Sequence, residues 1–403
     1  MANQQLTIDM ITREALRILV NMLSFTKHAN REYDKSFAVS GAKIGDTLRI
    51  RKPSRYIGRS GNTLSTEDHV EKSTELVLDT LFGVDAEWTS KEMTLEMDDF
   101  AQRHLLPAMA TIANKIDYDG LGQYKNVGNQ VGTPGTTPAT SLIVLQVGQR
   151  LSEEACPKDQ LRTLVVNPDT EATIVDALKG IFNPAGTISE QFTTGNMGRA
   201  LGFKWSMDQN VRQHTTGTHT TSSTPLVNGA SQSGESLITD GWQASTAVLK
   251  AGDIITIADV NAINPQNRDL TGSGVRQFTV TEDVTSDGAG NATLSIAPPI
   301  FADTHQFATV DNLPANDAAL TMTGTEDTAY PINMAFHRDA FVLGTADLIV
   351  PEGTHSAHVE NHEGISMRIV QDFDIVNNKF ITRIDVLYGW ATVYQELACR
   401  LIG

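Results

Sequence analysis

The sequence predicts an α+β protein whose mixed body of helices and strands is interrupted by an all-β insertion. Helical and period-two patterns occur in separate blocks and do not alternate as the strand–helix–strand units of a doubly wound sheet would. Residues 213–332 carry three Lys/Arg against thirteen Asp/Glu, so this block has a net charge of −10 in a chain whose net charge is −17. A composition shift of this size predicts a separate domain.

Composition narrows the function classes before any motif is considered. The 403 residues are 40% hydrophobic and 20% charged, which is typical of a folded globular chain. The net charge of −17 argues against a general nucleic-acid binder, because phosphates need a basic face. No apolar run approaches the roughly 18 residues of a membrane span, so no membrane association is expected. Cys156 and Cys399 cannot form a disulfide framework, which favours a reducing compartment, and both are expected to be buried.

The first elements of the chain are a helix and a long hairpin. Apolar residues at helical spacing follow Thr7, a suitable N-cap, and predict a helix to about Phe25. The pattern changes to period two from residue 43, and it resumes at 76–78 after a stretch of proline and glycine. These two runs predict a two-stranded excursion.

Three helices are expected in the body. The first begins at Ser90 and should kink or restart at Pro107, because proline removes a donor and clashes with the preceding turn. Its apolar stripe is Leu105, Met109, Ile112 and Ile116. The second spans 138–154, with its proline at the first helical position. The third spans 168–178, and Asn167 is its expected cap.

Short apolar or alternating runs predict the strands of the body. The apolar run at 161–166 is too short for a helix, so it predicts a buried strand. Residues 338–343 suggest one more short helix. Asn377 and Asn378 between two alternating runs predict a hairpin over 365–390, since asparagine tolerates the positive φ of a tight turn. Within the insertion, regular turn signals favour a small barrel or sandwich. Its strands are expected near 253–258, 276–282 and 292–297.

Motifs for catalysis and cofactor binding are not found, so no catalytic residue and no cofactor is expected. The one cluster worth weighing is His355, His358 and His362, which could bind a transition metal from one helical face. Gly353 and Gly364 flank this run, so solvated histidines of a loop are the favoured interpretation. A metal-dependent hydrolase that uses the three histidines stays as a less favoured alternative.

A basic cluster on the first arm of the excursion faces an acidic return arm. One interpretation is a solvated hairpin with cross-strand ion pairs. A nucleic-acid arm is disfavoured, because the acidic arm cancels the positive field. Docking on a neighbouring subunit is favoured, since a long hairpin does not stabilise itself in water. The candidates for inter-subunit contact are Arg49, Arg51, Lys52, Arg55 and Arg59.

Five segments, in order along the chain, resemble the major capsid (coat) proteins of short-tailed, double-stranded-DNA bacteriophages that carry an inserted β-barrel domain. The segment at 102–117 resembles the long spine helix of that family, and 164–169 resembles its strand followed by Asn-Pro and a helix. The other three are 251–258 with 264–265 and 277–281, then 335–341, and then 383–389. Asp259 departs from the family, in which a glycine is expected, so the local turn is expected to differ.

The resemblance implies the tailed-phage and herpesvirus major capsid fold, with an N-arm, an extended loop, peripheral and axial domains, and an inserted antiparallel β-barrel domain. The N-arm would be 1–38, and the extended loop hairpin 39–88. The peripheral domain would contain the spine helix at 89–132 and the strand hairpin at 364–390. The axial domain would be 133–212, 333–363 and 391–403, and the inserted domain 213–332.

The resemblance also implies the function of a viral structural protein. Such a protein self-assembles as hexamers and pentamers into an icosahedral shell that encloses double-stranded DNA without sequence-specific binding. A scaffolding protein and a portal are the implied partners, with assembly in the host bacterial cytoplasm and final location in the virion. The main alternative is an acidic, β-rich surface or adhesin protein, suggested by the Thr/Ser/Gly-rich insertion. The helical body and the missing secretory signal count against that alternative.

Overall fold

The computed structural model divides the chain into two compact units, each built from segments that are distant in sequence. The structure describes residues 8–31, 47–58, 61–64, 66–68, 70–89, 105–178, 198–219 and 224–403. The first unit comprises 1–50, 73–120 and 341–393, and the second comprises 51–72, 121–340 and 394–403. In the part of the chain that is described, no helix is long and apolar enough to cross a membrane.

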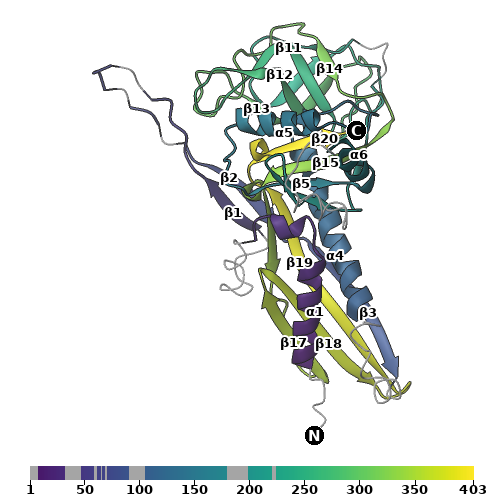
Figure 1. Cartoon of the computed structure of the whole chain (residues 1–403). Coiled ribbons are helices and arrows are strands. Elements are labelled where there is room, and N and C mark those ends of the chain that lie inside the picture. Colours follow the sequence, from purple (N-terminus) through teal and green to yellow (C-terminus); the bar gives the residue numbers. More distant parts are fainter. Residues whose placement is uncertain are drawn as a thin grey trace. The chain divides into compact units, whose positions relative to one another are not determined.

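The first unit is a five-stranded antiparallel sheet with two helices, α1 (Ile8–Met22) and α4 (Leu106–Leu121) (Figure 1). The strand order is β16–β19–β18–β17, and β3 pairs with β19. The strands are β3 (Thr80–Thr89), β16 (Phe341–Ala346), β17 (Ser356–His362), β18 (Ile365–Asp374) and β19 (Lys379–Thr392). The predicted hairpin over 365–390 is confirmed, and Asn378 in its turn has a φ of 52°.

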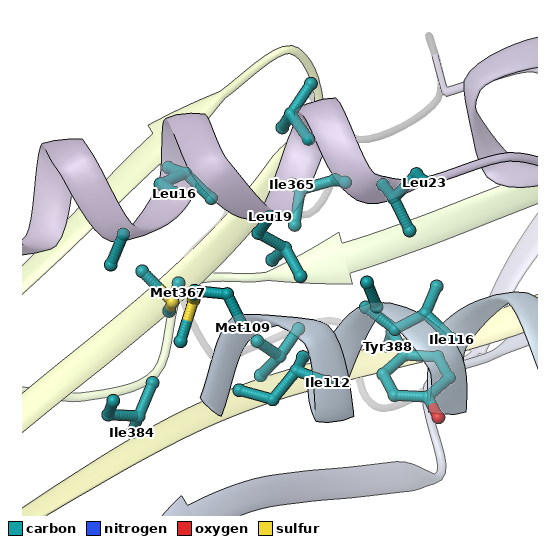
Figure 2. Packing of buried hydrophobic residues seen from close by; sticks show 14 of the residues in the cluster. Leu16, Leu19, Leu23, Met109, Ile112, Ile116, Ile365, Met367, Ile384 and Tyr388 are labelled. Carbon is teal, nitrogen blue, oxygen red and sulfur yellow. The ribbon is translucent and has the colours of Figure 1, made fainter. Parts of the chain in front are cut away.

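The core of the first unit lies between the two helices and the sheet (Figure 2). Leu16 and Leu19 of α1 and Met109 and Ile112 of α4 are fully buried, and they pack with Met367 of β18. The predicted apolar stripe of α4 is therefore confirmed. The described part of this helix begins at Leu106, and Pro107 is its second residue. The predicted starts at Thr7 and Ser90 lie outside the described residues.

The histidine-rich segment is strand β17, not the loop that the sequence predicted. It pairs with β18 along its whole length, from Ser356 with Gln371 to His362 with Ile365. Glu363 and Gly364, at φ 51° and 80°, form the two-residue turn between the strands. Positive φ at both central residues is the geometry of a tight hairpin turn. Gly364 therefore lies in a hairpin turn. The sequence analysis had interpreted it as the end of a loop.

Two helix predictions are also wrong in detail. Residues 338–343 form one 3-10 turn, Arg338–Ala340, followed by β16, because residues 341–345 are buried and pair with β19. The helix expected from residue 138 begins at Ser141 as α5 (Ser141–Glu153), since Thr140 still has an extended backbone. In the first case, tertiary pairing overrides a local helical pattern.

The body of the second unit is a seven-stranded mixed sheet that carries α5 and α6 (Pro168–Leu178). The order is β4–β20–β15–β5–β7–β6, and β8 pairs with β15. The strands are β4 (Gln130–Val131), β5 (Arg162–Val166), β6 (Arg199–Ala200), β7 (Phe203–Met207), β8 (Gln213–Thr215), β15 (Ala329–His337) and β20 (Ala398–Ile402). The predicted strand at 161–166 is confirmed as the buried β5, and the Asn167 side chain caps α6 by accepting from the Thr170 N–H.

The insertion is an antiparallel six-stranded sheet around its own apolar core, with the order β14–β11–β12–β13–β10–β9. Its strands are β9 (Leu226–Val227), β10 (Gly234–Asp240), β11 (Ile254–Ile263), β12 (Leu270–Val280), β13 (Ala292–Ile300) and β14 (Leu320–Met322). A bridge between Leu226 and Ala319 joins its two edges, and the Val227 N–H donates to the Ala318 carbonyl at 3.0 Å. The sheet thus closes as a small barrel, which confirms the all-β prediction.

The chain enters and leaves this barrel on neighbouring strands, because Thr215 of β8 pairs with Ala329 of β15. The predicted limits of the insertion, residues 213 and 332, therefore lie in two paired strands that also belong to the sheet of the body. Asp259, the departure from the family pattern, has a φ of 61° in β11. This left-handed conformation favours glycine and explains why a glycine would suit the position.

Candidate assembly site

The excursion (residues 47–77) contains the five basic candidates for inter-subunit contact. Its strands β1 (Thr47–Lys52) and β2 (Lys72–Val77) form a two-stranded sheet. Arg49 Nε lies 3.1 Å from Glu75 Oε1, and Arg51 Nη1 lies 3.5 Å from Glu71 Oε2. Both arginine side chains are at least 74% exposed. These two candidates therefore form the solvated cross-strand pairs that one interpretation of the sequence expected.

Arg49→Gln combined with Arg51→Gln should change the free energy of unfolding of the unassembled chain by less than about 1 kcal/mol. The reason is that exposed ion pairs are screened by water and salt. Urea unfolding followed by circular dichroism measures this change. A loss of several kcal/mol would show that the hairpin depends on these pairs for its fold.

Lys52 and Arg55 lie in a pocket of the second unit, and Arg59 lies outside the described residues. Arg55 Nη2 is 2.7 Å from Glu396 Oε1, and both side chains are about two-thirds or more buried. The ammonium group of Lys52 lies 5.7 Å from the centre of the Tyr394 ring. Burial lowers the pKa of Lys52, while the Glu396 carboxylate acts in the opposite direction.

Lys72 completes this group, although the sequence analysis did not single it out. Its Nζ lies 4.5 Å from the ring centre of Phe301 and 4.4 Å from that of Phe307. Burial lowers the pKa of Lys72 as well. In the sequence, Lys72 follows Glu71 on the acidic arm, and the two rings are more than 200 residues away. No local signal could have brought them together.

The pocket has a volume of about 120 Å³ and adjoins a second hollow of about 430 Å³ that shares Arg55, Glu154 and Glu396 with it. Its charged lining residues are Lys52, Arg55, Lys72, Arg276, Glu154 and Glu396. Four cations thus face two carboxylates. A positive pocket on a chain with a net charge of −17 is suited to an anion.

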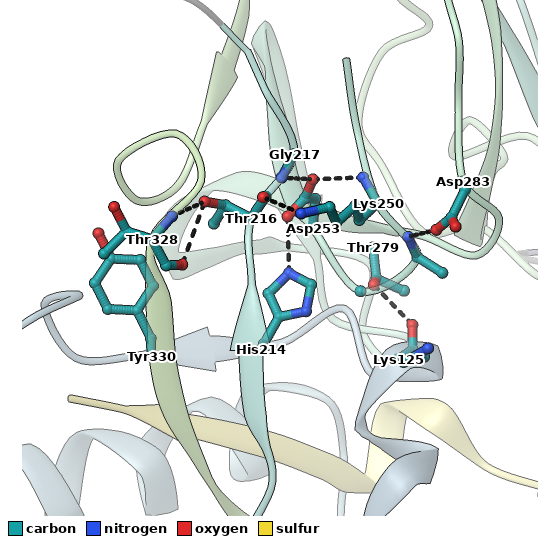
Figure 3. Close-up of polar contacts among 12 residues, drawn as sticks. Lys125, His214, Thr216, Gly217, Lys250, Asp253, Thr279, Asp283, Thr328 and Tyr330 are labelled. Carbon is teal, nitrogen blue, oxygen red and sulfur yellow. Dashed lines mark hydrogen bonds and ion pairs between the residues drawn. The ribbon is translucent and has the colours of Figure 1, made fainter. Parts of the chain in front are cut away.

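A second polar cluster joins the barrel to the body of the second unit (Figure 3). His214 Nε2 of β8 lies 2.7 Å from Asp253 Oδ1, and its Nδ1 lies 3.0 Å from Tyr124 Oη. Asp253 Oδ2 accepts from the backbone N–H groups of Gly217, at 3.0 Å, and Lys250, at 2.8 Å. His214 and Asp253 are at most 5% exposed. Because this chain of hydrogen bonds is closed to solvent, it holds two parts of the unit together and offers no access to a substrate.

Arg400 of β20 is buried beside this cluster. Its Nη1 donates to the Gly252 carbonyl at 2.5 Å, and its Nη2 donates to Thr279 Oγ1 at 2.7 Å. The guanidinium also lies 5.3 Å from the centre of the Tyr124 ring. Complete burial lowers the pKa of Arg400 to about 10. The C-terminal strand is therefore linked to the start of β11 and the end of β12.

A buried ion pair forms another link between barrel and body. Arg276 of β12 binds Glu154, which follows α5, and both side chains are at most 4% exposed. Next to this pair, the Gln277 side-chain carbonyl accepts from the Gln130 N–H at 2.8 Å. The Asn264 amide donates to the Glu153 carbonyl at 2.8 Å. The sequence analysis did not predict any of these contacts.

The histidines and cysteines that the sequence analysis singled out have contacts elsewhere in the chain. His358 of β17 lies 3.1 Å from Asp9 Oδ1 and 3.0 Å from Glu360 Oε2, while His355 packs edge-on against Phe380. Within the described ranges, no three His, Cys, Asp or Glu side chains could hold a metal ion. The cysteines are free and buried as predicted, and burial raises the pKa of both thiols, that of Cys399 to about 12. High thiol pKa values oppose a nucleophilic role.

The whole chain, residues 1–403, matches the family described as "P22 coat protein - gene protein 5". The protein is thus a major capsid protein of double-stranded-DNA bacteriophages, with the α+β capsid fold that the resemblance implied. Within this class, the chain belongs to the P22 coat protein family. This is a family of structural proteins of the virion shell, and the adhesin-like alternative does not describe it.

Several solved structures are similar to this chain at low sequence identity. A structure from Mycobacterium phage Che8 has 11% identity and a TM-score of 0.46, over 94% of this chain and 90% of that chain. The capsid of Ralstonia phage GP4 has 8% identity and a TM-score of 0.43, over 89% and 84%. The head structure of Helicobacter pylori bacteriophage KHP40 has 9% identity and a TM-score of 0.40, over 88% and 84%. No curated protein sequence matches the chain.

Proposed function

We propose that this coat protein assembles as hexamers and pentamers into a closed icosahedral shell around the double-stranded DNA genome. The observation that carries the proposal is the family match over the whole chain. The acidic chain, with a net charge of −17, supports enclosure of DNA without sequence-specific binding, since it offers phosphates no general basic face.

A scaffolding protein and a portal are the proposed partners, and the host bacterial cytoplasm is the proposed place of assembly. Two free, buried cysteines are compatible with a reducing compartment. The proposed limits of the domains are those that the resemblance implied, with 213–332 as the inserted domain. The closed barrel and its separate apolar core, whose residues lie between Val227 and Leu320, support an insertion within those limits.

The excursion is the proposed arm that docks on a neighbouring copy. Its described connection exposes large apolar side chains, with Tyr56 62% and Leu64 78% exposed. Glu67 shapes this connection by accepting from the N–H groups of Ile57, at 2.8 Å, and Gly58, at 2.7 Å. Apolar side chains on a structured connection favour burial against a partner. The exposed Arg49 and Arg51 would lie at the rim of such a contact.

The proposed function predicts megadalton closed shells when the purified chain is incubated with its cognate scaffold. Tyr56→Asp with Leu64→Asp should keep the circular dichroism and melting of the unassembled chain but block shells, because both side chains are exposed before assembly. Tyr56→Phe with Leu64→Met is the matched control and should assemble normally. Sedimentation and electron microscopy measure the outcome. Only small particles from the native chain with scaffold would contradict the shell, and normal shells from the Asp variant would contradict the docking arm.

A further inference from the structure

The pocket that contains Lys52 and Lys72 holds two ammonium groups without a carboxylate partner among the described residues. Each anion of the lining is already engaged, since Glu396 pairs with Arg55 and Glu154 pairs with Arg276. Two positive charges are therefore left facing a cavity of about 120 Å³. We call this cavity the two-lysine pocket.

This arrangement is unfavourable in the free chain. Lys52 and Lys72 are both partly buried, and a cation that is partly removed from water without a countercharge loses part of its hydration. The rings of Tyr394, Phe301 and Phe307 offset part of the loss by cation–π attraction, but they carry no net charge. The exposed carboxylate of Glu235 on β10 acts on both lysines only from beyond ion-pair distance. An anion inside the pocket would supply the missing partner.

We propose that the two-lysine pocket receives a carboxylate side chain from a second copy of this chain in the assembled shell. This inference rests on the proposed assembly of the shell. The chain has 48 Asp and Glu against 31 Lys and Arg, so a neighbouring copy presents many carboxylates. The pocket is formed at the base of the excursion, the arm proposed to meet that neighbour. A carboxylate inside the pocket would gain a charge-assisted hydrogen bond from one ammonium group and be attracted by the charge of the other.

A phosphate of the enclosed DNA is the competing anion, and the structure favours the carboxylate. The two-lysine pocket is small and walled by Phe307 and Tyr394, whereas a nucleic-acid strand needs an extended basic groove. A single side chain reaching in from another protein copy needs no such groove.

Carbodiimide cross-linking tests the proposal directly, because this reagent joins a carboxylate to an amine that it contacts. Copies labelled with ¹⁴N and ¹⁵N are mixed, assembled with scaffold in the absence of nucleic acid, cross-linked and digested for mass spectrometry. The expected result is mixed-isotope peptides that join Lys52 or Lys72 to an Asp or Glu of another coat-protein copy, found in shells and absent from the unassembled mixture.

Charge removal gives a second, independent readout. Lys52→Gln with Lys72→Gln should leave the melting temperature of the unassembled chain unchanged or raise it, since two poorly compensated charges are lost. The same variant should need about tenfold more protein to assemble at low salt, because an interfacial charge pair is lost. Lys158→Gln with Lys204→Gln removes two exposed charges from the same unit and is the matched control, expected to assemble as the native chain does.

The possible failures are distinguishable. If closed shells form but Lys52 and Lys72 give only same-isotope cross-links, or none, the proposal that the two-lysine pocket binds a carboxylate of another copy is wrong. The proposed assembly of the shell would still stand. Cross-links to the scaffold alone would also contradict the proposal, because the scaffold would then be the ligand. Protection of the lysines only after DNA is added would contradict it as well, because DNA would be the ligand. If the native chain forms no shells with its scaffold, the proposed function fails first and the inference fails with it.

Discussion

Glu154→Gln should lower the free energy of unfolding of the unassembled chain by about 3–5 kcal/mol, the range for breaking a buried ion pair by removing one partner. Glu154 and Arg276 are both at most 4% exposed, so water cannot replace the lost carboxylate charge. Arg150, whose pKa is lowered by burial, lies near enough to repel Arg276. The variant would thus leave two buried cations with no carboxylate between them.

Urea unfolding of the full chain measures this loss, and Glu153→Gln is the control. Glu153 lies one residue earlier and is only partly buried, so its loss should stay below about 1 kcal/mol. Glu154→Leu combined with Arg276→Met should recover much of the stability, since apolar groups of similar size often replace a buried pair without penalty. A Glu154→Gln variant as stable as the native chain would show that the pair does not hold the barrel to the body.

Asp253→Asn should lower the free energy of unfolding by about 2–4 kcal/mol. The carboxylate accepts from the N–H groups of Gly217 and Lys250 and contacts His214 (Figure 3). An asparagine side chain keeps only one oxygen. If its NH₂ group faces the backbone N–H groups, these donors lose their acceptor, and if it faces the imidazole, Nε2 of His214 must become an acceptor. The substitution also removes the negative charge that acts on the buried Arg400.

Amide hydrogen exchange gives this prediction its local readout. The N–H groups of Gly217 and Lys250 should exchange faster in Asp253→Asn, while amides in the core of the first unit should be unaffected in native-state opening. Asp283→Asn is the control, because the exposed Asp283 carboxylate, among the residues that the structure describes, accepts only from the Ala251 N–H at 2.8 Å. Its effect should stay below about 1 kcal/mol. Equal losses in both variants would rule out a special role for burial at Asp253.

The sequence by itself determined the elements whose evidence is local. The apolar stripe of α4, the buried strand β5, the Asn167 cap and the hairpin over 365–390 follow from spacing and turn residues, which depend only on near neighbours. The acidic composition of 213–332 likewise pointed to the segment that contains the barrel and its own apolar core.

Only the tertiary structure decided which charges became partners. Arg55 binds Glu396, and Arg276 binds Glu154. Lys72 reaches two phenylalanine rings. Each of these contacts joins residues that are more than 120 positions apart. The sequence around an arginine does not indicate which distant carboxylate it will pair with. Strand β17 belongs here too, since its polar residues form a strand only because β18 offers a complete ladder. Partner choice depends on packing and burial, which arise when distant segments come together, and local periodicity does not encode them.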